Sequence, residues 1–558
     1  MKIPVEDCQS SNSTATSRHW LFGSFIIAFI GALVLTFVQQ ILVQDYEQRS
    51  ITTDFVLRFL LNIFSWGLVV LLFPKYLLAV WFFLVALYQT GIFFYYSYFH
   101  VPPSFAVLNN NSDEGMEVLG TIFDFFPWKT FCFFLLVAGL QFYVLRQRQR
   151  FSFPLLRRLL YAIVCLVIFA GLLVGLNKGS RRLTSPFVYP LEPKVAKFGL
   201  LPVCLHEAWF LQHHSIQTFL ENARQQETQQ SDLLHHEYHP PHEWKNIVIL
   251  QVESLDYAVI RLKKEGKEVI PFINSLLDQS LNYRIWTQPS YGSATADFVM
   301  LNGCLPAKGL FNYNIPSYSF PLSLPAFLKE HGYQTFAVHG VRGSFYNRQQ
   351  AFNAMRVDHF IFRQELVEAL QKHPEKYEPL LDTLSIKQAL KDQWLDDDIL
   401  FAYSQKTLEE NQKPNQRNFF LIITTSSHGP WYDNYNDIIP VERTSQDRYL
   451  NSIHVFDQRL RRFYESLPEG TLLFIYGDHT PHFISGNYVS DIVGGKHFVP
   501  LIISVKGENI HDHQSVTLHD QISLRDVYSY IKNTVQEQQK KEQPITTATD
   551  SKIDRQIK

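Results

Sequence analysis

A hydroxyl-rich turn runs into an apolar segment near the middle of the chain, over Thr287–Gly303. It contains Ser293 and Thr295, and either hydroxyl could attack an electrophile. A serine or threonine hydroxyl is a weak nucleophile until a neighbouring base or a metal ion activates it. The turn is therefore a candidate nucleophile loop whose partners must come from elsewhere in the chain.

Candidate partners follow two apolar runs. Glu253 comes directly after Ile247–Val252, and the pair Asp478-His479 comes directly after Leu472–Gly477. Ligands gather at the carboxyl ends of strands in a mostly parallel α/β sheet, so we expect these side chains to meet. Two carboxylates, a histidine and a hydroxyl suit one divalent cation such as zinc or manganese. Such an ion holds an alkoxide at neutral pH and so produces a competent nucleophile.

Candidate strands and helices alternate from residue 244 to about 532, which predicts a doubly wound, mostly parallel sheet between two layers of helices. The strand candidates are Ile247–Val252, Thr335–Val338, His359–Phe362, Phe419–Thr424, Thr471–Tyr476 and Val499–Val505. The helix candidates are Pro271–Gln279, Leu324–His331, Ile386–Leu395, Asp398–Glu410 and Ser445–Leu467. The acidic run Asp396–Asp398 is interpreted as a helix N-terminal cap, which the helix dipole favours.

Five apolar stretches in the first third of the chain are each long enough to cross a hydrocarbon core of about 30 Å. They run over Trp20–Val43, Phe55–Phe73, Tyr76–Phe99, Trp128–Leu145 and Leu159–Asn177. The first stretch is interpreted as a retained anchor, because it is too long and too late to be a cleaved signal peptide. Arg58 and Lys75 lie near span ends and are interpreted as snorkelling side chains.

Basic residues predict the orientation of these spans. The loop between the fourth and fifth spans holds five arginines, between residues 146 and 158, whereas residues 101–127 contain no lysine or arginine. The arginine-rich loop is therefore expected in the cytoplasm. Everything after about residue 178 is then expected on the outer face, although Lys178, Arg181 and Arg182 oppose the rule.

The predicted organisation has five parts. They are a cytoplasmic amino terminus (1–19), a five-helix transmembrane domain (20–177), a juxtamembrane connector (178–243), a catalytic domain (244–532) and a disordered tail (533–558). The connector contains a candidate amphipathic helix, Glu207–Arg224, which could lie on the membrane surface or pack on the soluble domain. A net charge of −2 gives no indication of nucleic-acid binding. The five cysteines show no metal-ligand spacing, and pairing of Cys204 with Cys304 is left open.

Residues 244–505 resemble the extracellular domain of the lipoteichoic acid synthase and phosphoglycerol transferase group, in the sulfatase-like branch of the alkaline phosphatase superfamily. The most specific short match is Y-G-D-H at 476–479, which implies metal ligation by Asp478 and His479. The resemblance also places a metal carboxylate on Glu253. A family pattern like G-x-T-S-x-x-E-F places the nucleophile, which is also a metal ligand, on Ser293, with serine in place of the usual threonine. Thr295 remains the alternative.

Two further segments resemble parts of the family that bind phosphate. The first runs from His339 to Arg348 and implies that these two residues grip the phosphate, with an aromatic ring at Tyr346. The second implies a phosphate contact from His428 and contains Trp431 as a further candidate for substrate binding. Independently of the resemblance, an arginine fork matches two phosphate oxygens, and histidine can transfer protons near neutral pH.

The resemblance implies a membrane-bound, metal-dependent phosphoglycerol transferase of a bacterial cell envelope. Its donor would be a membrane phospholipid such as phosphatidylglycerol, and its acceptor an extracytoplasmic glycan or polymer. One Mn²⁺ is the favoured cofactor, with Zn²⁺ or Mg²⁺ as alternatives. Other interpretations are a phosphoethanolamine transferase, a sulfate-ester enzyme or a non-catalytic membrane scaffold. Sulfate hydrolysis is disfavoured because residues 293–297 lack the proline and arginine of the C/S-x-P-x-R motif.

Overall fold

The computed structural model describes residues 8–42, 53–99, 103, 128–148, 154–177, 192–213, 234, 244–264, 266–287, 292–307, 311–315, 318–381, 394–429, 431, 444–481, 488–494, 496–511 and 520–542. These residues form two compact units. One contains the amino-terminal apolar helices together with the start of the connector, and the other contains the α/β domain.

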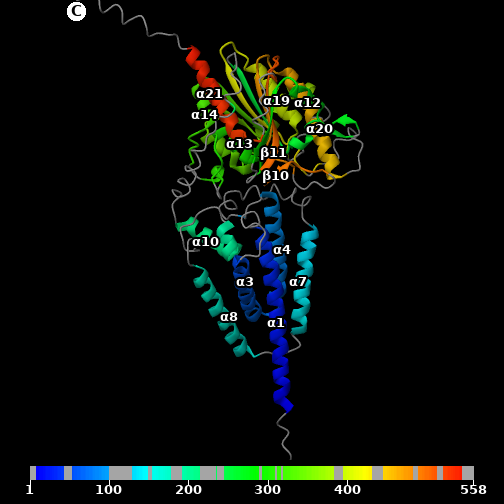
Figure 1. Ribbon diagram of the computed structural model, residues 1–558, viewed down its shortest axis with the longest axis vertical. Helices are drawn as coiled ribbons and strands as arrows, with labels where there is room; N and C mark the ends of the chain where they lie inside the picture. Colours follow the sequence, from blue (N-terminus) through cyan, green and yellow to red (C-terminus); the bar gives the residue numbers. More distant parts are fainter. Residues whose placement is uncertain are drawn as a thin grey trace, which may run out of the picture. The chain divides into compact units, whose positions relative to one another are not determined.

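Five long apolar helices form the first unit (Figure 1). They are α1 (Cys8–Ile41), α3 (Thr53–Leu72), α4 (Lys75–Phe99), α7 (Trp128–Arg148) and α8 (Leu155–Leu176). Each contains a stretch of 18 to 24 residues whose length and composition suit a membrane span. The five predicted spans therefore correspond to five candidate membrane helices.

Arg58 does not snorkel as the sequence predicted, because its side chain is fully buried in α3. The guanidinium donates hydrogen bonds to the Ala196 carbonyl oxygen and to Gln40 Oε1. Nearby, the Asn62 amide donates to Thr36 Oγ1 at 2.8 Å. A buried arginine is tolerated when carbonyl and amide oxygens solvate it, and these groups supply that solvation. Lys75, in contrast, is exposed.

Two short helices of the connector, α9 (Glu192–Phe198) and α10 (Leu200–His213), belong to the same unit. The predicted amphipathic helix therefore begins earlier than residue 207, and its second half lies outside the described residues. Gly199 ends α9 with a φ of +80°, and a Cβ there would lie 2.7 Å from Gln39 Nε2. Only glycine combines this backbone angle with so close an approach.

An eight-stranded mixed sheet forms the centre of the second unit. Its strands are β1 (Asn246–Val252), β4 (Leu281–Thr287), β6 (Tyr333–His339), β7 (His359–Ile361), β8 (Arg417–Ile423), β9 (Leu472–Gly477), β10 (Ile492–Val493) and β11 (Lys496–Val505). The order is β10-β11-β9-β1-β8-β6-β7, and β4 pairs with β11. Strands β9, β1, β8, β6 and β7 are parallel, whereas β11 is antiparallel to its neighbours. A separate hairpin joins β2 (Lys263–Lys264) to β3 (Lys267–Glu268).

Strand β4 was not predicted from the sequence. Its residues alternate between buried and half-buried positions, and it pairs with β11 from Leu281 opposite Ile503 to Thr287 opposite His497. Polar Asn282 and Arg284 interrupt the apolar character of this segment, so it lacks the continuous apolar run of the other strands. The strand leads directly into the hydroxyl-rich turn.

Helices cover both faces of the sheet, as predicted (Figure 1). On one face lie α12 (Pro271–Leu277), α16 (Arg363–Lys372), α19 (Asp397–Glu410) and α20 (Ser445–Ser466). On the other lie α13 (Ser293–Asn302), α14 (Leu324–Glu330) and α21 (Leu524–Glu542). Shorter helices are η2 (Tyr257–Val259), η3 (Asn312–Asn314), η4 (Phe345–Asn347), α15 (Arg348–Ala354), α17 (Pro374–Tyr377) and η5 (Glu378–Leu380).

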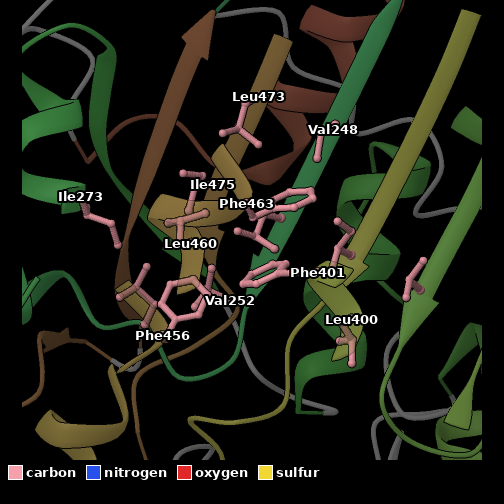
Figure 2. Packing of buried hydrophobic residues seen from close by; sticks show 14 of the residues in the cluster. Val248, Val252, Ile273, Leu400, Phe401, Phe456, Leu460, Phe463, Leu473 and Ile475 are labelled. Atoms are coloured by element: carbon pink, nitrogen blue, oxygen red, sulfur yellow. The ribbon is translucent and has the colours of Figure 1, made fainter. Parts of the chain in front are cut away.

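Figure 2 shows how the first of these faces packs. Val248, Leu473 and Ile475 project from adjacent strands into one core with Phe401 of α19 and Phe463 of α20. The two phenylalanine rings stack with their centroids 4.8 Å apart. Every residue of β1 and β9 is buried. Strands buried on both faces give continuous apolar runs, which is why they could be recognised in the sequence.

One predicted helix falls largely outside the described residues, and one predicted domain boundary falls inside a helix. Most of the candidate helix Ile386–Leu395 lies outside the described residues. The predicted boundary at residue 532 falls inside α21, which continues to Glu542. Val535 is buried in that helix, whereas Gln536 is exposed. Residues 543–558 lie outside the described part.

Candidate active site

The ends of β1 and β9 place Glu253, Asp478 and His479 beside one another. The two strands are parallel neighbours, with Val252 opposite Gly477, so the residues that follow them start at the same level of the sheet. All three side chains are buried, and one potential ligand atom from each lies within 4.8 Å of the others. The structure thus brings together three of the four residues predicted to bind a metal ion.

The donor atoms of this group fit a divalent cation. Asp478 Oδ1 accepts hydrogen bonds from the backbone nitrogens of Ser254 and His479, at 2.8 and 2.7 Å, whereas the buried Oδ2 accepts none with ordinary geometry. His479 Nδ1 lies 2.9 Å from the Thr480 carbonyl oxygen, to which it can donate. The Nε2 lone pair is then left to face the carboxylates, as in histidines that bind metals.

Electrostatics also favour a cation here. Burial raises the pKa of Asp478 to about 7, and the Glu253 carboxylate raises it as well. Burial alone would lower the pKa of His479, but the charges of Asp478 and Glu253 raise it above its usual value. Two buried carboxylates that share a single histidine repel each other, and a bound cation offsets that repulsion. The group therefore has the composition of a metal centre.

Ser293 is the residue of the hydroxyl-rich turn that reaches this group. It is the first residue of α13, its Oγ donates to Glu253 Oε2 at 2.9 Å, and the same Oγ lies 3.4 Å from His479 Nε2. Thr295 is buried inside the same helix. Two residues of helix turn it roughly 200° away from Ser293 about the helix axis. The geometry therefore favours Ser293 over Thr295 as the candidate nucleophile.

A buried glutamine that the sequence analysis did not single out holds Ser293 in place. Gln251, in β1, donates from Nε2 to the carbonyl oxygen of Ser293 at 3.0 Å. Its Oε1 accepts from the Tyr476 hydroxyl at 2.8 Å, so both ends of the amide are fixed. A polar residue inside an otherwise apolar central strand was the available signal.

We expect Gln251→Leu to lower kcat about 10- to 100-fold, in the range of losses that follow when a supporting residue near a metal site is removed. Metal content should be unchanged, because Gln251 touches the nucleophile backbone and none of Glu253, Asp478 and His479. Steady-state kinetics with metal analysis tests this. Tyr476→Phe is the matched control, because it removes only the second hydrogen bond and should cost less. Equal losses in both variants would contradict the expectation.

Gly292 permits the sharp entry into α13. Its φ is +59° and its ψ is −151°, and a Cβ at this position would lie 2.4 Å from the Tyr346 hydroxyl. Tyr346 is buried and has a φ of +55°, and Asn347 beside it has a φ of +58°. Consecutive non-glycine residues in this region carry strain, which proteins often keep at functional sites. The predicted substrate residue Tyr346 therefore packs against the nucleophile turn.

Gly292→Ala should reduce kcat roughly 100-fold, because displacement of a reacting group by about 1 Å can have an effect of that size. Adding Tyr346→Phe removes the hydroxyl that the new Cβ meets. The kcat lost on adding Gly292→Ala to the Tyr346→Phe variant should then be smaller than the kcat lost on adding Gly292→Ala to wild type. Absence of any recovery would show that backbone strain alone limits the variant.

Arg348 is more constrained than the sequence predicted. Its guanidinium is fully buried, with Nε donating to Asp297 Oδ2 at 2.6 Å and Nη1 lying 3.3 Å from His339 Nε2. Nη2 is buried and makes no hydrogen bond. The expected two-pronged grip on phosphate is thus reduced, because Asp297 occupies Nε. A single arm, Nη2, is left for an oxygen ligand.

His339 is held from both sides of its ring. Its Nδ1 lies 2.9 Å from the Ile423 carbonyl oxygen and can donate to it, while Nε2 accepts from Arg348. Burial, together with the positive charge of Arg348, holds the pKa of His339 well below its usual value. The imidazole is therefore neutral at neutral pH. In this geometry His339 orients Arg348.

His428 lies on the loop after β8, which α19 holds in place. Asp397 Oδ1 accepts from the backbone nitrogen of Thr425 at 2.7 Å. Asp396 caps α19, since its side chain accepts from the Asp397 nitrogen, so the capping interpretation of this acidic run is confirmed. Burial lowers the pKa of His428 to about 4. The Trp394 ring meets the His428 ring edge-on, with centroids 4.3 Å apart.

Asp397 should make the stability of the protein pH-dependent. Burial, and then the charge of Asp396, raise its folded-state pKa to about 7, against about 3.9 in an unfolded chain. The unfolded state therefore loses its proton first, and folding stability falls as pH rises from about 4 to 7. Asp397→Asn mimics the protonated form. We expect the melting temperature of the variant minus that of wild type to increase from pH 5 to pH 8. A difference that does not change with pH would contradict this.

Trp431 lies in the hydrophobic core, which is one of the two positions that the sequence left open for it, the other being the wall of a substrate cleft. Its indole nitrogen donates to the Ser427 carbonyl oxygen at 2.7 Å, and its ring meets Tyr449 with centroids 5.4 Å apart. This anchors the chain that carries His428.

Comparison with known proteins shows the family of the chain. Residues 245–530 match the Sulfatase family, and the chain belongs to that family. It is similar to lipoteichoic acid synthase 2 of Bacillus subtilis, with 27% identity over 301 residues, which are 49% of this chain and 43% of that protein. It is also similar to the lipoteichoic acid synthase of Staphylococcus saprophyticus, with 25% identity over 42% of this chain and 36% of that protein.

The matched segments span less than half the length of these two relatives. Among solved structures, the lipoteichoic acid synthase LtaP from Listeria monocytogenes is 19% identical and has a TM-score of 0.41, over 56% of this chain and 81% of that chain. The chain is thus a sulfatase-family protein with five candidate membrane helices and a mostly parallel α/β domain.

Proposed function

We propose that the protein is a membrane-bound, metal-dependent phosphoglycerol transferase. In this proposal a glycerol phosphate group passes from a phospholipid such as phosphatidylglycerol to an extracytoplasmic glycan or polymer. The similarity to lipoteichoic acid synthases supports this choice among the activities of the sulfatase family. The observation that carries it is the placement of Ser293 Oγ 2.9 Å from Glu253 Oε2, beside a buried group with the composition of a metal centre.

Glu253, Asp478 and His479 would hold the ion, with Ser293 Oγ at its side. When bound, the cation supplies positive charge that stabilises the serine alkoxide and the charge gathering on the phosphoryl oxygens. Mn²⁺ is the proposed ion, and Zn²⁺ and Mg²⁺ are alternatives of the same charge.

The reaction proceeds in two displacements at phosphorus. First, the Ser293 Oγ–P bond forms and the bond between phosphorus and the diacylglycerol oxygen breaks, and the proton released by serine ends on the departing diacylglycerol. Then an acceptor hydroxyl forms its own bond to phosphorus, the Ser293 Oγ–P bond breaks, and the acceptor's proton returns to serine. Arg348 Nη2 faces the phosphoryl oxygens, and neutral His428 relays the protons.

The membrane helices explain why such an enzyme would be anchored, since its donor is itself a membrane lipid. The distribution of arginines supports an orientation with the α/β domain on the outer face of a bacterial cytoplasmic membrane. Acceptor glycans or polymers of the envelope lie on that side.

Peptide mass spectrometry of the full-length protein tests the proposal. The protein is incubated with Mn²⁺ and mixed phospholipids without acceptor, and the peptide covering residues 285–308 is examined for an adduct. Glycerol phosphate on Ser293 is the expected result. The same group on Thr295 would overturn the assignment of the nucleophile, and phosphoethanolamine would overturn the assignment of the donor. No adduct together with no bound metal would favour a non-catalytic scaffold.

A further inference from the structure

Helix α10 carries apolar side chains on two sides. Its inner positions, Leu200, Val203 and Phe210, are buried against the helical unit. Leu201, Leu205 and Trp209 form a second stripe, which we call the outer stripe, and they are 55%, 63% and 52% exposed. Their spacing of four residues places them on one side of the helix. Large apolar side chains aligned in this way on an exposed helix face are typical of an interaction surface.

No charged side chain borders the outer stripe within α10. The only acidic residue of the helix, Glu207, is fully buried on the inner side. His206 lies flat against Trp209, with ring centroids 6.1 Å apart and planes inclined by 15°. The exposed surface of α10 therefore has the composition of a surface that contacts lipid, with an aromatic ring at a position suited to the membrane interface.

The helix is fixed to the membrane unit by polar contacts at its amino-terminal end. Arg58 of α3 holds the carbonyl oxygen of Ala196 in α9, and the Gly199 nitrogen donates to the Val195 carbonyl oxygen at 2.8 Å. The turn at Gly199 packs against Gln39 of α1. The outer stripe therefore lies on a helix whose start is fixed to the helical unit. These contacts limit rotation of α10 that would bury the stripe.

The length of α10 favours a position at the membrane interface over a position across the bilayer. Its 14 residues cover roughly 21 Å, less than the roughly 30 Å needed to cross a bilayer core. It lies at one end of the long helices and runs across them (Figure 1). Helix α8 exposes the same kind of side chains, including Leu155, Leu156 and Leu160, over its outer surface. One apolar environment can therefore surround both helices.

We propose that α10 is an interfacial membrane helix whose outer stripe inserts among the lipids of the leaflet at that end of the bundle. Its depth is set by the apolar side chains, and its position along the bundle is set by the contact between Arg58 and α9. This inference concerns the helical unit alone and does not depend on which group the enzyme transfers.

Quenching of Trp209 fluorescence tests the proposal. Full-length wild type and Trp209→Phe are reconstituted in vesicles of phosphatidylcholine and phosphatidylglycerol, with or without lipids brominated near the headgroup end of the acyl chain. Subtracting the emission of Trp209→Phe from that of wild type isolates Trp209 among the nine tryptophans. We expect brominated lipid to remove most of this difference signal and aqueous iodide to have little effect.

Two control tryptophans calibrate the result. The same subtraction with Trp128→Phe reports an exposed tryptophan at the start of a membrane helix, and Trp244→Phe reports a buried one in the α/β unit. Quenching of the Trp209 signal by iodide alone would place the stripe in water. Protection from both quenchers, as for Trp244, would place it against protein. Either outcome overturns the proposal, and Leu205→Cys with a nitroxide label provides a second measurement of depth if Trp209→Phe is poorly folded.

Discussion

Ser293→Ala should abolish group transfer while leaving the fold and the bound metal in place. Removal of a nucleophile typically lowers kcat by roughly 10⁴-fold or more. The Ser293 hydroxyl is half-buried and donates to Glu253 Oε2, so its loss removes one hydrogen bond and should cost about 1–3 kcal/mol of stability without unfolding the protein. Turnover of phosphatidylglycerol in detergent micelles and metal content per chain are the two measurements.

Thr295→Val is the matched control for this result. It removes the other hydroxyl of the turn while preserving the shape of a side chain that is buried in α13. We expect activity within a few-fold of wild type, with any change caused by lost stability. If Thr295→Val lost activity and Ser293→Ala retained it, the assignment of the nucleophile would be wrong.

Asp478→Asn should have the second largest effect, a loss of metal together with at least a 10³-fold loss of kcat. The amide keeps the size of the side chain but cannot supply the negative charge of Oδ2, which is buried 3.6 Å from His479 Nε2. Metal binding to the folded state stabilises it by mass action, so wild type should melt at a higher temperature when Mn²⁺ is added. The variant should lose that increase.

Without metal the same substitution should leave stability unchanged or raise it. Asp478 and Glu253 place two carboxylates in a buried site, and removing one negative charge relieves their repulsion. Asp457→Asn is the control, because Asp457 is another buried carboxylate but accepts from the backbone of α12, at Phe272 and Ile273. It should keep its metal. A large destabilisation of metal-free Asp478→Asn would show that the carboxylate has a structural role.

The strands that carry the metal group could be predicted because their sequences are locally distinctive. Residues 247–252 and 472–477 are continuous apolar runs followed by polar residues, and the rule that ligands gather at strand ends places Glu253 near Asp478. The register of β1 against β9 puts them at the same level of the sheet. The arrangement of the metal group was thus accessible from short segments of sequence.

The supports of the nucleophile were not accessible in the same way. Gln251 contacts Ser293 only because β1 and α13, far apart in sequence, lie side by side in the fold. The contact between Gly292 and Tyr346 depends on positive φ angles that the residue type of Tyr346 does not suggest. The engagement of Arg348 with Asp297 likewise depends on side-chain directions. Such details follow from tertiary packing, which composition and periodicity do not encode one residue at a time.

In the helical unit, too, the helices could be predicted but a buried side-chain contact could not. Its apolar helices could be found by length and composition, but Arg58 near a span end was interpreted as exposed to the interface. The structure buries it against the Ala196 carbonyl oxygen, 138 residues further along the chain. The partner that makes burial favourable is thus invisible in the local sequence.

The pairing of β4 with β11 has a consequence for the order in which the sheet is completed during synthesis. The strand that leads to Ser293 pairs along its whole length with β11, which ends at Val505, and its Trp286 makes one isolated bridge to Ser523. A growing chain released as far as Asp478 and His479 would already contain every proposed metal ligand, but the strand before the nucleophile would still lack its partner. The strand that leads to Ser293 is therefore expected to take its final place only after β11 has been made, although every proposed metal ligand precedes β11 in the chain.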